Sequence, residues 1–471
     1  MRLKILLLFS AGLLGLPSIS GAVSLAENSP GQVLIFPYYN THNEKLSLLS
    51  VSNTRTDRSV AMAISARTLG DAELSFIVYL APSSTWTGAL YSEATGARLY
   101  SSDGNCRHPR QQLQGAVDLP RSGFLIAYEL GVLRSASALQ AATRSRANSW
   151  GTTWSNHRPE ERNDCDLIAA AWADAGVWNE NPSTDMDAPA NSLSGHLQIV
   201  ETRRGIGFSL QPLVLQNFSD AVLHRDVTRH SVTLDDARPP RSQVRIGQEE
   251  IESNWTRGVD AVSATLMSRS AATDVWLVPE IGAESDVTFT FPTWAFYDAS
   301  RPGPFASNDL LSTGVRLTLD LRDRNGLPYD TFVGFCDPPP PTMVDSRPLL
   351  DRAMLSFATS ISDPLDPSAE RLHGMHPAPG CGGFWQTRVI QEFTGRLIAF
   401  AAPIENSGYG EPRQSFRSIE GHVYPGLPGI VTALSRARTD DWATPPGQPT
   451  YSYGFGLPTV YQRQVIREPR H

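Results

Sequence analysis

The sequence predicts an all-β fold, built as two β-sandwich-like domains with a few short helices. Runs of aromatic and β-branched residues recur along the 471-residue chain, separated by Gly, Pro, Asn and Asp. This pattern is typical of many short strands. Several runs alternate apolar and polar residues, and half-buried strands of this kind need a second layer to cover their apolar face. Helical periodicity is confined to two segments.

The predicted strands cover both halves of the chain. In the first half they are 33–38, 46–51, 60–66, 74–80, 123–130 and 196–201. In the second half they are 262–267, 275–279, 287–292, 315–321, 331–335, 384–391 and 397–401. The clearest is 315–321, which has Val or Leu at every odd position and polar residues between them. Asn325-Gly326 follows it and favours a tight hairpin turn.

Two segments predict helices. The stronger is 165–178, because Asn163 or Asp164 can cap it, and Ile168, Ala171 and Trp172 share one side. The Ala-rich segment 136–147 is the second.

The first residues have the three-part pattern of a secretory signal peptide. Arg2 and Lys4 precede an apolar run over 5–16, and small residues then offer cleavage after Ala22 or after Ala26. The apolar run is shorter than the ~20 residues of a stable membrane span. We therefore expect an exported protein that is periplasmic, cell-surface or secreted, with no membrane span in the mature chain.

The four cysteines predict two disulfides, because an even, sparse count in an exported chain favours pairing. Three pairings are possible. We favour Cys106–Cys165 and Cys336–Cys381, since each pair lies within one half of the chain. The predicted organisation is a signal peptide at 1–26, one domain at 27–240 with a helical insertion, and a second at 241–471. The boundary falls within the segment 235–242, which contains Pro239 and Pro240 and is typical of a linker or long loop.

Charge and motifs exclude several function classes. The first 26 residues hold two basic and no acidic side chains, so the formal charge of −8 becomes −10 in the mature chain. Such a charge disfavours nucleic acid and anionic lipid as partners. The chain lacks Gly-x-Ser-x-Gly, His-Glu-x-x-His, the Walker loop and Gly-x-Gly-x-x-Gly. We therefore assign no catalytic residue and no cofactor.

Two weak metal-site candidates remain. His373 and His376 lie near Cys381, but Pro and Gly make this segment a loop, and an oxidised cysteine cannot bind metal. Asp320, Asp323, Asn325 and Asp330 flank the predicted hairpin and could hold calcium. Turn chemistry by itself explains Asp323 and Asn325.

The leading functional prediction is a non-enzymatic envelope or secreted protein that acts as a structural, adhesive or ligand-binding module. A cell-envelope protein or a glycan would be its partner. The alternative is a carbohydrate-active enzyme, a glycoside hydrolase or lyase on a β-sandwich scaffold. Such an enzyme needs two facing carboxylates, and Glu129, Glu201, Glu249 and Glu250 are the candidates.

Several phrases in a fixed order resemble a family of uncharacterised exported proteobacterial proteins with no established activity. They include Phe-Pro-Tyr-Tyr at 36–39, Leu-Leu-Ser-Val-Ser-Asn-Thr at 48–54, Gly-Phe-Leu-Ile-Ala-Tyr-Glu at 123–129 and Gly-His-Leu-Gln-Ile-Val at 195–200. Thr-Phe-Pro-Thr at 290–293 comes last, and the family usually has a lysine after it where this chain has Trp294. The resemblance runs from about residue 32 to about 400. The resemblance implies export and a β-rich fold, and it transfers no function to this chain.

Overall fold

The computed structural model describes most of the chain from Gly21 to Arg467. The described residues are 21–467 apart from 69, 110–118, 144–163, 204, 279–281, 299–300, 302, 306–314, 328–342, 350–351, 358–392, 401–414 and 439–451. They form antiparallel sheets with a few short helices, which confirms the predicted all-β class. Within this described part, no helix has the length and apolar character needed to cross a membrane.

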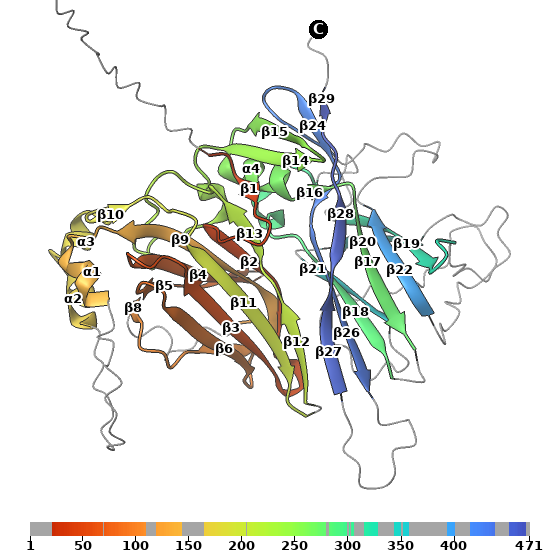
Figure 1. Ribbon diagram of the computed structural model, residues 1–471, viewed down its shortest axis with the longest axis horizontal. Coiled ribbons are helices and arrows are strands. Elements are labelled where there is room, and N and C mark those ends of the chain that lie inside the picture. Colours follow the sequence, from red (N-terminus) through yellow and green to blue (C-terminus); the bar gives the residue numbers. More distant parts are fainter. Residues whose placement is uncertain are drawn as a thin grey trace, which may run out of the picture.

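The first half is a sandwich of two sheets (Figure 1). The larger sheet has the path β1 (Ser24–Leu25), β13 (Leu213–Gln216), β2 (Val33–Asn40), β9 (Ser122–Leu133), β4 (Val60–Thr68), β5 (Gly70–Leu80) and β8 (Cys106–His108), and β10 (Met186–Asp187) pairs with β9. The smaller sheet has the order β12 (Ile206–Leu210), β11 (Leu193–Glu201), β3 (Lys45–Asn53), β6 (Thr85–Ser92) and β7 (Ala97–Tyr100). A core that includes Phe36, Phe76 and Trp86 fills the space between them.

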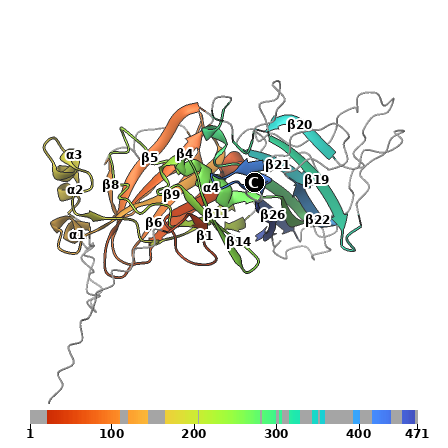
Figure 2. The ribbon, with the colours of Figure 1, turned by 90° about the horizontal axis from the view of Figure 1, so that it is seen from above.

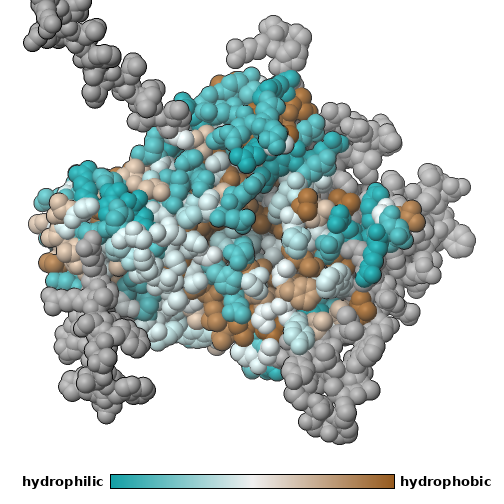
Figure 3. All heavy atoms as spheres, in the orientation of Figure 1, coloured by the Kyte–Doolittle hydropathy of each residue, from teal (hydrophilic) through white to brown (hydrophobic). Residues whose placement is uncertain are grey.

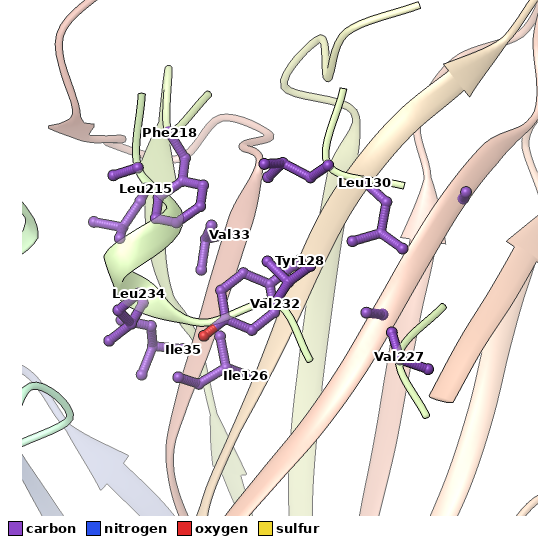
Figure 4. Close-up of a cluster of buried hydrophobic side chains, with 14 of the residues drawn as sticks. Val33, Ile35, Ile126, Tyr128, Leu130, Leu215, Phe218, Val227, Val232 and Leu234 are labelled. Carbon is purple, nitrogen blue, oxygen red and sulfur yellow. The ribbon is translucent and has the colours of Figure 1, made fainter. Parts of the chain in front are cut away.

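The larger sheet is covered on both faces. All twelve residues of β9 are buried, as expected for a mainly apolar strand with layers on both sides. Figure 4 shows the outer layer, in which Phe218, Val232 and Leu234 lie over Ile35 and Tyr128. Three short helices, α1 (Ala138–Thr143), α2 (Cys165–Trp172) and α3 (Val177–Glu180), lie beyond the β8 and β10 end of this sheet (Figures 1 and 2).

The second half also has two main sheets. One has the order β20 (Met343–Leu349), β19 (Val315–Asp323), β22 (Phe393–Phe400), β17 (Ser270–Leu277) and β28 (Thr459–Gln462), and the other has the order β21 (Arg352–Phe357), β18 (Glu284–Thr290), β26 (Ile430–Arg438) and β27 (Ser452–Leu457). A smaller sheet joins β23 (Ser415–Arg417), β24 (His422–Pro425) and β29 (Ile466–Arg467). A tight turn follows β19, since Gly326 N donates to Asp323 O at 3.0 Å and Gly326 has a φ of 79°. The strand expected to complete this hairpin lies outside the described residues.

The two halves pack directly on each other where β27 runs beside β12 (Figure 1). The approach is so close that a Cβ on Gly454 would lie 2.7 Å from the Gly207 carbonyl oxygen. We call the buried cluster on the outer side of the larger sheet, which includes Phe218 and Tyr128, the outer core. The hairpin of β14 (Arg241–Ile246) and β15 (Glu249–Asn254) adds Val244 to it, and α4 (Gly258–Leu266) adds Val259 and Val262. The proposed division near residue 240 stays a prediction.

Most of the predicted strands in the described part are confirmed, and one is wrong. Residues 262–266 of this segment lie in helix α4, all nine residues of which are buried, and Met267 follows the helix. Its β-branched residues suggested a strand, but a short helix that is buried on every side can have the same mainly apolar composition. Asp235 Oδ1 accepts a hydrogen bond from Val259 N in its first turn at 3.0 Å, a partner from outside the helix. The predicted strands at 331–335 and 384–391 lie outside the described residues.

The helix predicted at 165–178 is two helices. α2 ends at Trp172, and α3 begins at Val177 after Gly176, whose missing Cβ lets it lie against the Ala170 and Ala171 carbonyls. In the region of the 136–147 prediction, α1 spans Ala138–Thr143. The disulfide Cys106–Cys165 is present and joins β8 to the start of α2. Cys336 and Cys381 lie outside the described residues.

Candidate functional site

The smaller sheet of the first half leaves its outer face to solvent. Side chains alternate along its strands, so that in β3 Leu49 and Val51 point into the core while Leu48 and Ser50 point outward. We call the outward side chains of this sheet the open face. They are Leu46, Leu48, Ser50, Ser52, Thr85, Thr87, Ala89, Tyr91, Arg98, Tyr100, Ser194, His196, Gln198, Val200 and Ser209.

Strand register sorts the open face into rows. Over β3, β6 and β7, Leu48 is opposite Ala89, which is opposite Tyr100, and this apolar row exposes 38% of Leu48 and 56% of Tyr100. On its other side, Leu48 is opposite the polar Gln198 of β11, which is opposite Ser209. The next row towards the other end of β3 has Ser50 between His196 and Thr87. Figure 3 shows the face uncovered, with a hydrophobic patch near the lower ends of β3 and β6. One end therefore offers apolar contact and the other offers hydroxyl groups.

The hydroxyl-bearing end is organised by its own hydrogen bonds. Ser52 Oγ lies 2.7 Å from Thr85 Oγ1. His196 Nε2 lies 3.3 Å from Ser209 Oγ, and its Nδ1 lies 3.3 Å from Gln211 Nε2. Arg98 is the one Arg, Lys, Asp or Glu residue of the open face, and it pairs with Glu93 at 3.0 Å. The face is thus nearly free of formal charge.

A buried polar network lies at the opposite end of the sandwich, between β5 and the short helices. His224 Nδ1 lies 2.6 Å from the Pro182 carbonyl, which can only accept, so Nδ1 carries the proton. His224 Nε2 then accepts from the Tyr79 hydroxyl at 2.9 Å, and the Tyr79 oxygen accepts from Trp172 Nε1–H at 2.8 Å. Each polar group in this series of hydrogen bonds therefore has a hydrogen-bond partner.

Burial sets the protonation of this network. It lowers the pKa of His224 to about 4 and raises the pKa of Tyr79 well above its usual value. His108 stacks on Trp172 and lies 3.4 Å from Asp226, and its pKa is also lowered by burial. The side chains of Tyr79 and His224 have no open path to a substrate, because 0% and 2% of these residues are exposed. The network therefore holds α2 and α3 on the sheet. Sequence analysis missed it, because its members are far apart in the chain.

A second Ser–His contact has the elements of a nucleophile and its base. Ser253 Oγ lies 2.7 Å from His422 Nδ1. The same oxygen lies 2.7 Å from the Tyr424 hydroxyl, and Ser253 is fully buried. A nucleophile must reach its substrate. This arrangement therefore joins β15 to β24 and offers no attack on a ligand.

The four carboxylates proposed for a glycosidase are not brought together. Glu129 is buried in β9 of the larger sheet, and its oxygens accept from Ala190 N and Ser192 N, both at 2.8 Å. Burial raises its pKa. Glu201 lies in β11 of the smaller sheet, 4.0 Å from Arg436.

The other two carboxylates lie on the exposed β15 hairpin. Glu249 pairs with Arg467 at 2.5 Å, and Glu250 pairs with Arg245 at 2.9 Å. Each of the four carboxylates therefore interacts with backbone N–H groups or with an arginine, and none faces another of the four as a glycosidase requires.

The calcium candidates are only partly within the described residues. Asp323 Oδ1 accepts from Asn325 N and Leu327 N, both at 2.9 Å, so turn chemistry accounts for it. Asp330, His373, His376 and Cys381 lie outside the described residues. Among all the described residues of the chain, no cluster of three or more His, Cys, Asp or Glu side chains is placed so that it could hold a metal ion.

A shallow apolar crevice with a cavity volume of about 10 Å³ lies where Phe124 and Ile126 meet Leu234 and Phe296. It has room for about one water molecule, far below the roughly 300–1,000 Å³ of ligand pockets. The open face is therefore the better candidate surface. A scan against protein-family models and a search of curated proteins found no match to this chain.

Proposed function

We propose that this protein is an exported, non-enzymatic binding module whose open face holds an uncharged polysaccharide of the cell envelope. The observation that supports this most is the composition of the open face, where an apolar row with exposed Leu48 and Tyr100 adjoins rows of Ser, Thr and His. A sugar ring offers the same combination, since its C–H faces pack on apolar side chains while its hydroxyls exchange hydrogen bonds.

Charge selects among the possible ligands. With Arg98 already paired to Glu93, the open face has no cluster of charge to attract an acidic or basic polymer. A flat sheet without a deep cleft suits an extended chain better than a small molecule. These features favour a neutral glycan. The leader pattern and the Cys106–Cys165 disulfide are consistent with an oxidising, exported location.

Affinity electrophoresis of the mature protein in gels that contain neutral polysaccharides would test the proposal. We expect retardation by at least one of them. Tyr100→Ala should weaken that binding about tenfold, which corresponds to about 1.4 kcal/mol. Ile419→Ala is the matched control, because Ile419 is 67% exposed in the second half, outside the open face, and its loss should leave binding unchanged.

Three results would contradict the proposal. One is a failure of every neutral polysaccharide to retard the protein, and another is retardation that Tyr100→Ala leaves intact. The third is release of new reducing ends during incubation, which would favour the alternative of a carbohydrate-active enzyme.

A further inference from the structure

We infer that the leader is removed after Ala22, so that the mature chain begins at Val23 and keeps strand β1. The inference rests on the proposed export. The sequence offers two sites with small residues at the required positions, after Ala22 and after Ala26. The two sites differ in their effect on the fold. Cleavage after Ala26 would remove the whole of β1, whereas cleavage after Ala22 would leave it attached.

Strand β1 lies between two strands that come much later in the sequence than it does. On one side it pairs with β13, with Ser24 opposite Gln216 and Leu25 opposite Leu215. On the other side Val23 forms a parallel bridge with Ser242 of β14. Figure 1 shows β1 between the larger sheet and the β14–β15 hairpin. This short strand is therefore the link between them.

The hydrogen bonds of residues 23–26 show what its loss would leave behind. Val23 N donates to Arg241 O at 2.8 Å, and Val23 O accepts from Gln243 N at 2.8 Å. Ala26 N donates to Val214 O at 2.9 Å. A chain that began at Glu27 would leave these three groups on β13 and β14 without those partners, and the free energy of these hydrogen bonds would be lost.

The burial of the Val23 side chain also favours cleavage after Ala22 over cleavage after Ala26. Val23 is completely buried in the outer core, whereas Glu27 is exposed. A free amine at Val23 can still donate to the Arg241 carbonyl, as the amide nitrogen does. Cleavage after Ala22 therefore keeps both the buried side chain and the backbone pairing of β1.

Intact-mass measurement of the full-length protein recovered from the periplasm or the medium would test the site. We expect a chain that begins at Val23. A start at Glu27, or at any other residue, would overturn the inference while leaving export intact. Protein found only in the cytoplasm with Met1 still present would instead overturn the proposed export, and the inference with it.

A stability comparison supplies the second test. Chains that begin at Val23 or at Glu27 would be produced behind a heterologous leader, together with a Val23 chain that carries Val23→Ala. We expect the Glu27 chain to be lost or its Tm to fall. Val23→Ala should lower the Tm by at least about 2 °C, and Glu27→Ala, the matched exposed control, should leave it unchanged. Equal Tm values for the Val23 and Glu27 chains would overturn the role given to β1.

Discussion

At the scale of single residues, buried polar side chains hold irregular segments on the sheets. Glu129 is fully buried and binds the backbone of the segment before β11 through Ala190 N and Ser192 N. His224 joins the Pro182 carbonyl to Tyr79 of β5. Buried polar groups cost free energy unless they are hydrogen-bonded. Their exchange for other side chains should therefore destabilise the fold.

His224 should make the stability of the protein depend on pH. Burial holds its folded pKa at about 4, whereas the unfolded chain has the ordinary value of 6.5. Between these values the unfolded chain binds the proton more readily, so the free energy of unfolding falls as the pH is lowered. The contribution is fully present above pH 6.5. By pH 5 its loss should amount to about 2 kcal/mol.

Urea unfolding at several pH values between 7.5 and 5 would measure this effect. His224→Gln keeps a donor and an acceptor but does not titrate, so its free energy of unfolding should fall less over the same range. Carboxylates contribute equally to both proteins, and the difference between the two curves isolates His224. Parallel curves would show that His224 is not the titrating group.

At the scale of elements, α2 has two anchors that are independent of its helical hydrogen bonds. Cys165 at its start is bonded to Cys106 of β8. Trp172 at its end donates to Tyr79 of β5 at 2.8 Å. The helix has only eight residues, too few for stability on its own. Tertiary anchors, rather than helix propensity, therefore keep it formed.

Cys165→Ser should destabilise the first half of the molecule. The disulfide closes a loop with a sequence separation of 59, and loss of a native bridge typically costs about 2–5 kcal/mol. Hydrogen exchange should show faster exchange of the α2 amides, while β18 and β26 keep their protection. Non-reducing peptide mapping of the wild-type protein is the control. Unchanged protection of α2 in the variant would mean that the bridge does not anchor it.

At the scale of the whole molecule, a buried ion cluster lies where the halves meet. Arg436 of β26 donates through Nε to Glu284 Oε2 at 2.8 Å, and its Nη1 lies 4.0 Å from Glu201 of β11. Burial of a charge is tolerated when opposite charges surround it, and here Glu284 raises the pKa of Arg436 against the effect of burial. The cluster thus ties the sheet of the second half to the smaller sheet of the first.

Arg436→Met should therefore leave the buried Glu201 and the half-buried Glu284 without their guanidinium group. Removal of one partner from a buried ion pair costs about 3–5 kcal/mol, and urea unfolding would measure the loss. Arg245→Met removes the guanidinium from the exposed Arg245–Glu250 pair and should leave the midpoint unchanged. A midpoint for Arg436→Met equal to that of the wild type would show that the cluster does not stabilise the contact between the halves.

The alternating and continuous apolar runs of the sequence were sufficient to predict the all-β class and strands such as β2, β4, β9 and β19. Cysteine parity and position were sufficient for the Cys106–Cys165 pair. These signals depend on neighbouring residues or on composition, so they can be recognised in a single sequence. The strand predicted in place of α4 was wrong because a short, fully buried segment has no exposed face, and therefore no periodicity that would separate helix from strand.

The tertiary structure alone decided which surfaces stay open and which side chains meet. Outward residues of β3, β6 and β11 form one face only because strand order and register bring them together. For the same reason β1 meets β13 and β14, which follow it by about 190 residues or more. Tyr79, Trp172 and His224 meet for the same reason. Sequence spacing contains no information about contacts of this length, because they depend on how the sheets pack.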